Sequence, residues 1–155
     1  MADVAHLTAR FLHVGAALLW VGYLAFLAWA VIPAARHGGA HGANVGPIVE
    51  RIRPFTFLGP LVLAFGLWLV TASGHAYGEL LQPGWGHAIT GGIVLSIAMM
   101  GLEHGLVAPR LRDAHTGPTE EREDHLAKAS TGAQVAAVLG LLAAFLMVLA
   151  LLGGL

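Results

Sequence analysis

The sequence contains no cysteine, and only 11% of its 155 residues are Asp, Glu, Lys or Arg. Without cysteine the chain can form no disulfide, thiolate metal site, iron–sulfur cluster or covalent haem attachment through C-x-x-C-H. Lys and Arg number 8 and Asp and Glu number 9, which gives a net charge of −1. Because such a chain has no excess of positive charge to hold a polyanion, we expect no nucleic-acid partner.

Apolar residues make up 57% of the sequence and gather into four long stretches that lack Lys and Arg. About 20 apolar residues suffice for a helix to cross a bilayer. We therefore predict an all-α integral membrane protein, one domain over residues 1–155, with spans at about 11–32, 55–73, 87–108 and 130–153. The first stretch is too long for the apolar region of a typical signal peptide, so we interpret it as a span. Antiparallel order and a short connection between the second and third spans favour an up-down-up-down four-helix bundle.

Cations are distributed unevenly among the connections. Seven of the eight lie between spans one and two or between spans three and four: Arg36, Arg51, Arg53, Arg110, Arg112, Arg122 and Lys128. Arg10 alone lies on the other side of the predicted bundle. The positive-inside rule then predicts a multi-pass protein of the cell inner (plasma) membrane, with both termini on the non-cytoplasmic side.

Small residues recur at helical spacing in two spans. They are Gly132, Ala136, Gly140 and Ala144 in the fourth span and Gly101 and Gly105 in the third. Helices in lipid associate through close contact of small residues and a few hydrogen bonds. We expect these residues to form helix interfaces, with Thr131 and Gln134 supplying polar contacts.

Histidine is unusually frequent for so apolar a chain, with 9 residues. The predicted topology places His13, His75 and His87, from three different spans, in the outer leaflet. Imidazoles from different helices at one depth can clamp a b-type haem without any cysteine. We predict His13 as a ligand of haem iron, with His75 ahead of His87 as the opposite ligand.

Three further residues fit this predicted haem site. Arg10 lies one turn outside His13 on the same helix face, where its guanidinium could pair with haem propionates. Trp20 and Trp68 each lie seven residues deeper in the membrane than a histidine. For Trp20, which is near the midplane, a flat wall of the cofactor site and ordinary bundle packing are equally good interpretations.

A second polar group lies near the inner edge of the third span. Glu103 is the only acidic residue inside any of the predicted spans. Because it precedes Arg110 by seven residues, an ion pair between the two side chains at the membrane interface is the simplest expectation. Met100, His104 and Glu103 could instead present ligands to copper. Both possibilities are kept.

Short motifs in the first three spans resemble a group of small membrane proteins. Arg10-Phe11-Leu12-His13, Leu19-Trp20-Val21-Gly22 and Pro33 resemble the first span shared by copper-resistance D (CopD-like) domains, HemJ-type protoporphyrinogen oxidases and the N-terminal membrane domain of cytochrome-linked urate hydroxylases. Arg53-Pro54-Phe55, Gly66-Leu67-Trp68 and Gly84-Trp85-Gly86-His87 resemble later motifs of the group. The resemblance implies a four-helix membrane fold in which the first-span histidine, here His13, binds haem b or takes part in redox chemistry.

Three hypotheses about function follow. The first is a haem b-binding membrane protein with a redox or electron-transfer role near the outer leaflet, working with a partner protein or a membrane-soluble substrate; as an enzyme it would be an oxidoreductase. The second is a protein for copper transport or handling. The third is a structural subunit without a cofactor, held in a homo- or hetero-oligomeric membrane complex by its small-residue faces.

Overall fold

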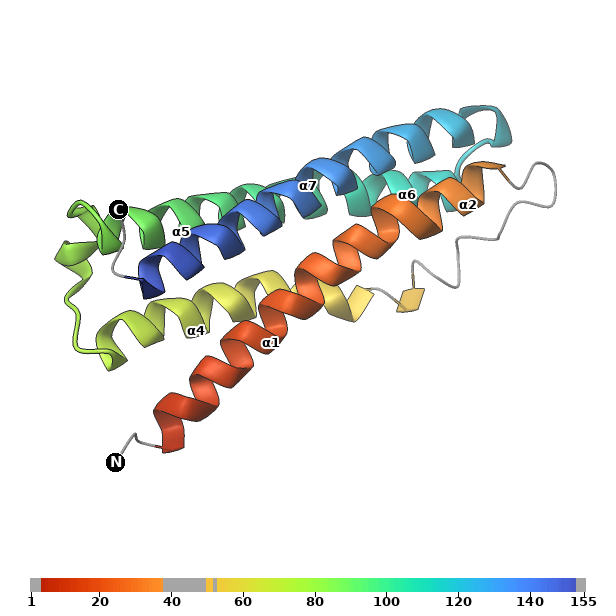
Figure 1. Cartoon of the computed structure of the whole chain (residues 1–155). Coiled ribbons are helices and arrows are strands. Elements are labelled where there is room, and N and C mark those ends of the chain that lie inside the picture. The colour runs from red at the N-terminus through yellow and green to blue at the C-terminus, as the bar shows by residue number, and fades with distance from the viewer. Residues whose placement is uncertain (1–3, 38–49, 52, 153–155) are drawn as a thin grey trace.

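A computed structural model describes residues 4–37, 50–51 and 53–152, and all the regular elements in these ranges are helical (Figure 1). Four helical segments are long and apolar enough to cross a membrane: Val4–Arg36, Pro54–Ala72, Trp85–Thr116 and Thr119–Leu151. The predictions of an all-α chain and of a multi-pass membrane protein are confirmed at this level. The segments contain the four predicted spans, apart from a residue or two at the ends of the second and fourth, and three of them extend well beyond.

Each long segment is built from shorter elements. The first comprises α1 (Val4–Phe26), a π turn (Leu27–Val31) and α2 (Ile32–His37); the second comprises a 3-10 turn (Arg53–Phe57) and α4 (Leu58–Ala72). A 3-10 turn (Tyr77–Leu81) connects α4 to α5 (Trp85–Leu102), which continues through a π turn (Glu103–Val107) into α6 (Ala108–Thr116). A last 3-10 turn (Thr119–Glu121) leads into α7 (Arg122–Leu151).

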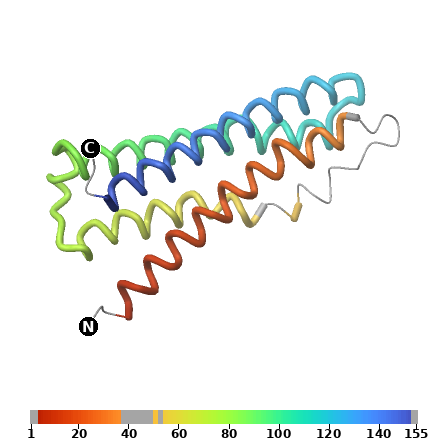
Figure 2. Tube along the Cα trace, in the orientation of Figure 1, coloured from red at the N-terminus to blue at the C-terminus, as the bar shows by residue number. Residues whose placement is uncertain are grey.

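Successive long segments run in opposite directions (Figures 1 and 2). The start of α1 and the end of α7 lie at the same end as the α4–α5 connection, which we call the α4–α5 end; the opposite one is the α6–α7 end. α1 lies obliquely across the bundle, packing on α4 and on α7, while α2 packs on α7. Which side of the membrane each end faces stays a prediction.

Both π turns end two residues before a proline. Leu27–Val31 precedes Pro33, and Glu103–Val107 precedes Pro109. A proline inside a helix lacks the N–H for the i→i−4 hydrogen bond, and its ring crowds the carbonyl one turn earlier. A local change to the wider π turn relieves this crowding while the helix continues, and such turns recur at functional sites.

Small residues of α7 form much of the helix interface, as predicted, but only some of the predicted residues lie there. Gly132 lies against Leu106 and Val107, and Gly140 lies against Val21 and Met99, so side chains of α1 and of the third segment fit where α7 has no side chain. Ala136 is also buried there.

Several predicted interface residues lie elsewhere. Ala144, Gly101, Gly105 and Gln134 are exposed, and a Cβ on Gly101 or Gly105 would meet nothing within 4 Å. Thr131 donates to Ala127 O of its own helix rather than to a neighbour. The prediction for Ala144 was wrong because fourfold spacing drifts around a helix of 3.6 residues per turn, so a long stripe read from sequence does not stay on one face.

Candidate functional site

A carboxylate is buried in the middle of the bundle. Glu103, the first residue of the second π turn, is 0% exposed, and its Oε2 accepts a hydrogen bond of 2.7 Å from Trp20 Nε1. Tyr23, one turn further along α1, also interacts with this carboxylate. Among the described residues, Oε1 of Glu103 has no hydrogen-bond partner. The carboxyl group therefore has one satisfied and one unsatisfied oxygen.

A glycine in α4 makes room for the indole that reaches Glu103. Trp20 is 1% exposed, and a Cβ added to Gly59 would lie 2.8 Å from its Cζ2 atom. Trp20 belongs to a buried cluster made up further of Ala16, Leu24, Val62, Met99, Ala136 and Ala137. Of the two interpretations of Trp20, the structure thus supports bundle packing, and it adds a role as hydrogen-bond donor to Glu103.

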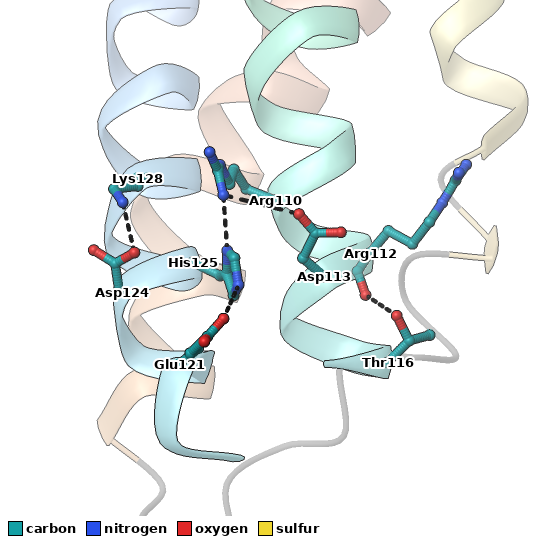
Figure 3. Close-up of polar contacts among 8 residues, drawn as sticks. All are labelled: Arg110, Arg112, Asp113, Thr116, Glu121, Asp124, His125 and Lys128. Atoms are coloured by element: carbon teal, nitrogen blue, oxygen red, sulfur yellow. Dashed lines mark hydrogen bonds and ion pairs between the residues drawn. The ribbon is translucent and has the colours of Figure 1, made fainter. Parts of the chain in front are cut away.

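The predicted ion pair between Glu103 and Arg110 is wrong. Arg110 lies in α6, where its Nη1 is 3.2 Å from His125 Nδ1 and 3.9 Å from Asp113 Oδ2 (Figure 3). The sequence spacing assumed a regular helix between the two residues. The intervening π turn adds a residue to that turn and rotates the two side chains away from a common face.

His125 occupies the centre of a polar network at the α6–α7 end. It is 8% exposed, and its Nε2 lies 3.5 Å from Glu121 Oε2 on the side opposite Arg110 (Figure 3). Because the guanidinium can only donate, Nδ1 must accept, and the ring proton belongs on Nε2 facing Glu121. A further ion pair, Arg36 to Glu123 at 2.7 Å, ties α2 to α7.

His13 is held between α1 and α4 by its Nδ1 atom. This nitrogen lies 2.9 Å from the carbonyl oxygen of Val62. Since a carbonyl oxygen only accepts, Nδ1 carries the proton and Nε2 is left with a free lone pair. Gly66 allows the close approach, because a Cβ there would lie 2.9 Å from His13 Cε1.

His75 has a comparable arrangement at the α4–α5 end. Its ring stacks on Trp85 with centroids 4.0 Å apart, and its Nδ1 lies 2.8 Å from Glu79 Oε2. This hydrogen bond, helped by a second one from the backbone N–H of Ala76, lowers the pKa of Glu79 below its usual range. His87 is exposed and bonds through Nε2 to the carbonyl oxygen of Leu81 at 3.1 Å.

The structure places the predicted haem ligands His13 and His75 at different levels along α4. The ring of His13 lies beside Gly66, whereas His75 follows the end of α4, about 10 Å further along that helix. Trp68 lies near His6, with ring centroids 6.4 Å apart, and Arg10 is exposed. In the described ranges no group of three or more His, Asp or Glu residues is placed to hold a metal ion.

The suggested copper ligands point in different directions. Glu103 faces Trp20 in the bundle interior, while His104 is exposed and bonds through Nδ1 to the Met100 carbonyl oxygen of its own helix. The geometry therefore gives no support to a site shared by Met100, His104 and Glu103.

The chain matches no protein-family model, no curated protein and no solved structure. The resemblance of its short motifs to the CopD-like, HemJ-like and urate hydroxylase group thus stays an expectation.

Sequence reasoning did not single out Tyr23, Gly59 or Val62. A usable signal for Tyr23 existed, because it follows Trp20 by three residues on one helix face and Glu103 is an acid inside an apolar span. No such signal existed for Val62, because its backbone carbonyl, and not its side chain, accepts the hydrogen bond from His13.

Proposed function

We propose that this chain is a haem b-binding integral membrane protein with an electron-transfer role, and that His13 would hold the haem iron. The hydrogen bond from His13 Nδ1 to the Val62 carbonyl carries the proposal. Histidines that bind iron or other metals commonly donate their second ring nitrogen to a carbonyl or carboxylate, which fixes the tautomer and orients the ring. The free Nε2 of His13 meets this requirement.

The resemblance of the first span to CopD-like, HemJ-like and urate hydroxylase membrane domains supports the same residue. In this proposal α4 acts as the support of the ligand: Val62 holds the Nδ1 proton and Gly66 gives the ring its place. Haem b, when bound, supplies one-electron chemistry that the side chains themselves lack. Arg10, exposed one turn away on α1, is the proposed partner for the propionates.

His75 stays the proposed second ligand, supported by its own Nδ1 contact with Glu79. A carboxylate in this position makes an imidazole a stronger ligand, because it stabilises positive charge on the ring. His13 and His75 lie at different levels along α4, and the spectra of His75→Ala and His87→Ala decide which histidine is the second ligand.

An absorption spectrum tests the proposal. The protein is purified from haem-replete cells, and its oxidised and reduced spectra are recorded. We expect a Soret band, and α and β bands on reduction, which His13→Ala abolishes and His115→Ala, a change at an exposed position of α6, leaves intact. Circular dichroism confirms folding of both variants.

Folded protein without a Soret band, or a spectrum that His13→Ala leaves unchanged, would overturn the proposal. If the Soret band is present, the variants His75→Ala and His87→Ala identify the second ligand. The variant whose spectrum changes from six-coordinate to five-coordinate iron is the one that lacks the second histidine ligand.

A further inference from the structure

Glu103 is the one fully buried carboxylate in the described part of the chain. The buried cluster that holds its hydrogen-bond donor, Trp20, is apolar: α7 contributes Ala136 and Ala137, and α4 contributes Val62. The titratable groups that interact with Glu103 are Tyr23 of α1 and the neighbouring His104. Tyr23 brings no positive charge, and the His104 ring is exposed on another face.

An ionised carboxylate in such surroundings is costly, since no Lys or Arg among the described residues is buried beside it to compensate its charge. The two oxygens are also unequal. Oε2 already accepts a hydrogen bond from Trp20, whereas Oε1 has no partner among the described residues. A neutral carboxyl group removes the charge, and its proton belongs on Oε1.

From this geometry we propose that Glu103 is a proton-binding site within the membrane, which holds a proton on Oε1 at neutral pH and exchanges it with water. The exchange is balanced: one proton adds to the carboxylate and the same proton later leaves, with no change in electron count. Ionisable groups inside membrane proteins commonly serve as such proton sites.

The position of Glu103 in the chain supports exchange rather than permanent burial. It begins the π turn before Pro109, where backbone hydrogen bonds are already rearranged. Arg110, at the polar α6–α7 end, follows seven residues later, about 10 Å along the helix axis. A proton therefore has a short apolar distance to cross.

Infrared difference spectroscopy of the full chain in lipid nanodiscs tests the site. At neutral pH we expect the wild-type protein to show a carbonyl band of a protonated carboxylic acid that is absent from Glu103→Gln. The matched control, Glu120→Gln, changes an exposed carboxylate at the α6–α7 end and should keep the band. Equilibration in D2O should shift the band to lower frequency, because the acid proton exchanges.

Two results would overturn the proposal. If no band at neutral pH disappears in Glu103→Gln, the group is ionised; if the band fails to shift after prolonged equilibration in D2O, the site does not exchange with water. Glutamine keeps an acceptor oxygen for Trp20 Nε1, so we expect this variant to fold. If Glu103→Gln does not fold, Glu103→Asp takes its place. We expect the protonated aspartic acid to shift the carbonyl band without removing it.

This inference does not depend on haem. Haem propionates are common to the wild type and both variants, so their bands cancel in the differences. If the wild-type protein has no Soret band, the proposed haem-binding function is wrong, but the proposal of a proton site at Glu103 is unaffected.

Discussion

The indole of Trp20 and the carboxyl group of Glu103 form a buried hydrogen bond of 2.7 Å between residues 83 positions apart in the sequence. It joins α1 to the turn between α5 and α6. Helices in lipid gain little from the hydrophobic effect, so close packing and such polar contacts hold them together. This bond lies where α4 also approaches, through Gly59, and thus at the centre of three segments.

Trp20→Phe should destabilise the protein by about 1–2 kcal/mol, because it removes the indole N–H from which Oε2 of the buried Glu103 accepts a hydrogen bond. The measurement is the free energy of unfolding in mixed detergent micelles. Trp29→Phe is the control, since Trp29 is 55% exposed, and it should change stability by about 0.5 kcal/mol or less. Equal effects of the two substitutions would contradict an energetic role for the bond.

Gly59→Ala should destabilise the bundle by about 1–3 kcal/mol, because the new Cβ would lie 2.8 Å from Trp20 Cζ2 and the bonded indole cannot move aside freely. Gly22→Ala provides the comparison. Gly22 lies in α1 with open space around it, so alanine there should be neutral or slightly stabilising, by up to about 1 kcal/mol. The same unfolding assay ranks the two variants, and a Gly59 variant as stable as wild type would argue against the close contact.

Runs of apolar residues were sufficient to predict the helical class and the four membrane segments, because the length needed to cross a bilayer is set by physics alone. Detail within the helices was harder to predict. The Glu103–Arg110 pair failed because a π turn, caused by Pro109, breaks the regular spacing. Gly101 and Gly105 failed because glycine frequency in membrane helices says nothing about which face meets a neighbour.

The candidate site could be predicted only in part. His13 was identified because a polar ring inside a bundle needs a partner. Its actual partner, the carbonyl of Val62, is a backbone group that any residue would supply, so no side-chain pattern could reveal it. Likewise, the burial of Glu103 beneath Trp20 depends on how α1 crosses the third segment, which is a tertiary property.

His125→Phe should destabilise the α6–α7 end by about 1–3 kcal/mol, because the buried ring accepts from Arg110 and faces Glu121, and phenylalanine offers neither group a partner. Hydrogen exchange of amides in α6 and the start of α7 reports this local loss. His115→Phe changes an exposed histidine of the same region and should leave exchange unchanged. Protection that survives His125→Phe would show that the network contributes little.

Glu79 should titrate below the ordinary glutamate pKa of about 4.3, since His75 and the Ala76 amide stabilise its charged form. A lowered folded-state pKa means that its contribution to stability is complete above the ordinary value and is lost as the pH falls through the lower one. The chemical shift of the Glu79 carboxyl carbon measures the midpoint. In His75→Ala the midpoint should rise, and an unchanged midpoint would remove the role of His75.

Gly66→Ala tests whether His13 is a ligand without removing its imidazole. The added Cβ would lie 2.9 Å from His13 Cε1, so the ring must move and its hydrogen bond to Val62 must weaken. A displaced imidazole would hold iron less well, and we expect haem dissociation to be about tenfold faster, equivalent to about 1.4 kcal/mol. Transfer of haem to excess apomyoglobin measures the rate. Gly15→Ala, which has open space within 4 Å in the same region of α1, should release haem at the wild-type rate. If folded Gly66→Ala also does so, then the imidazole of residue 13 does not bind the iron, because a ligand pinned between two helices cannot absorb that displacement without loss.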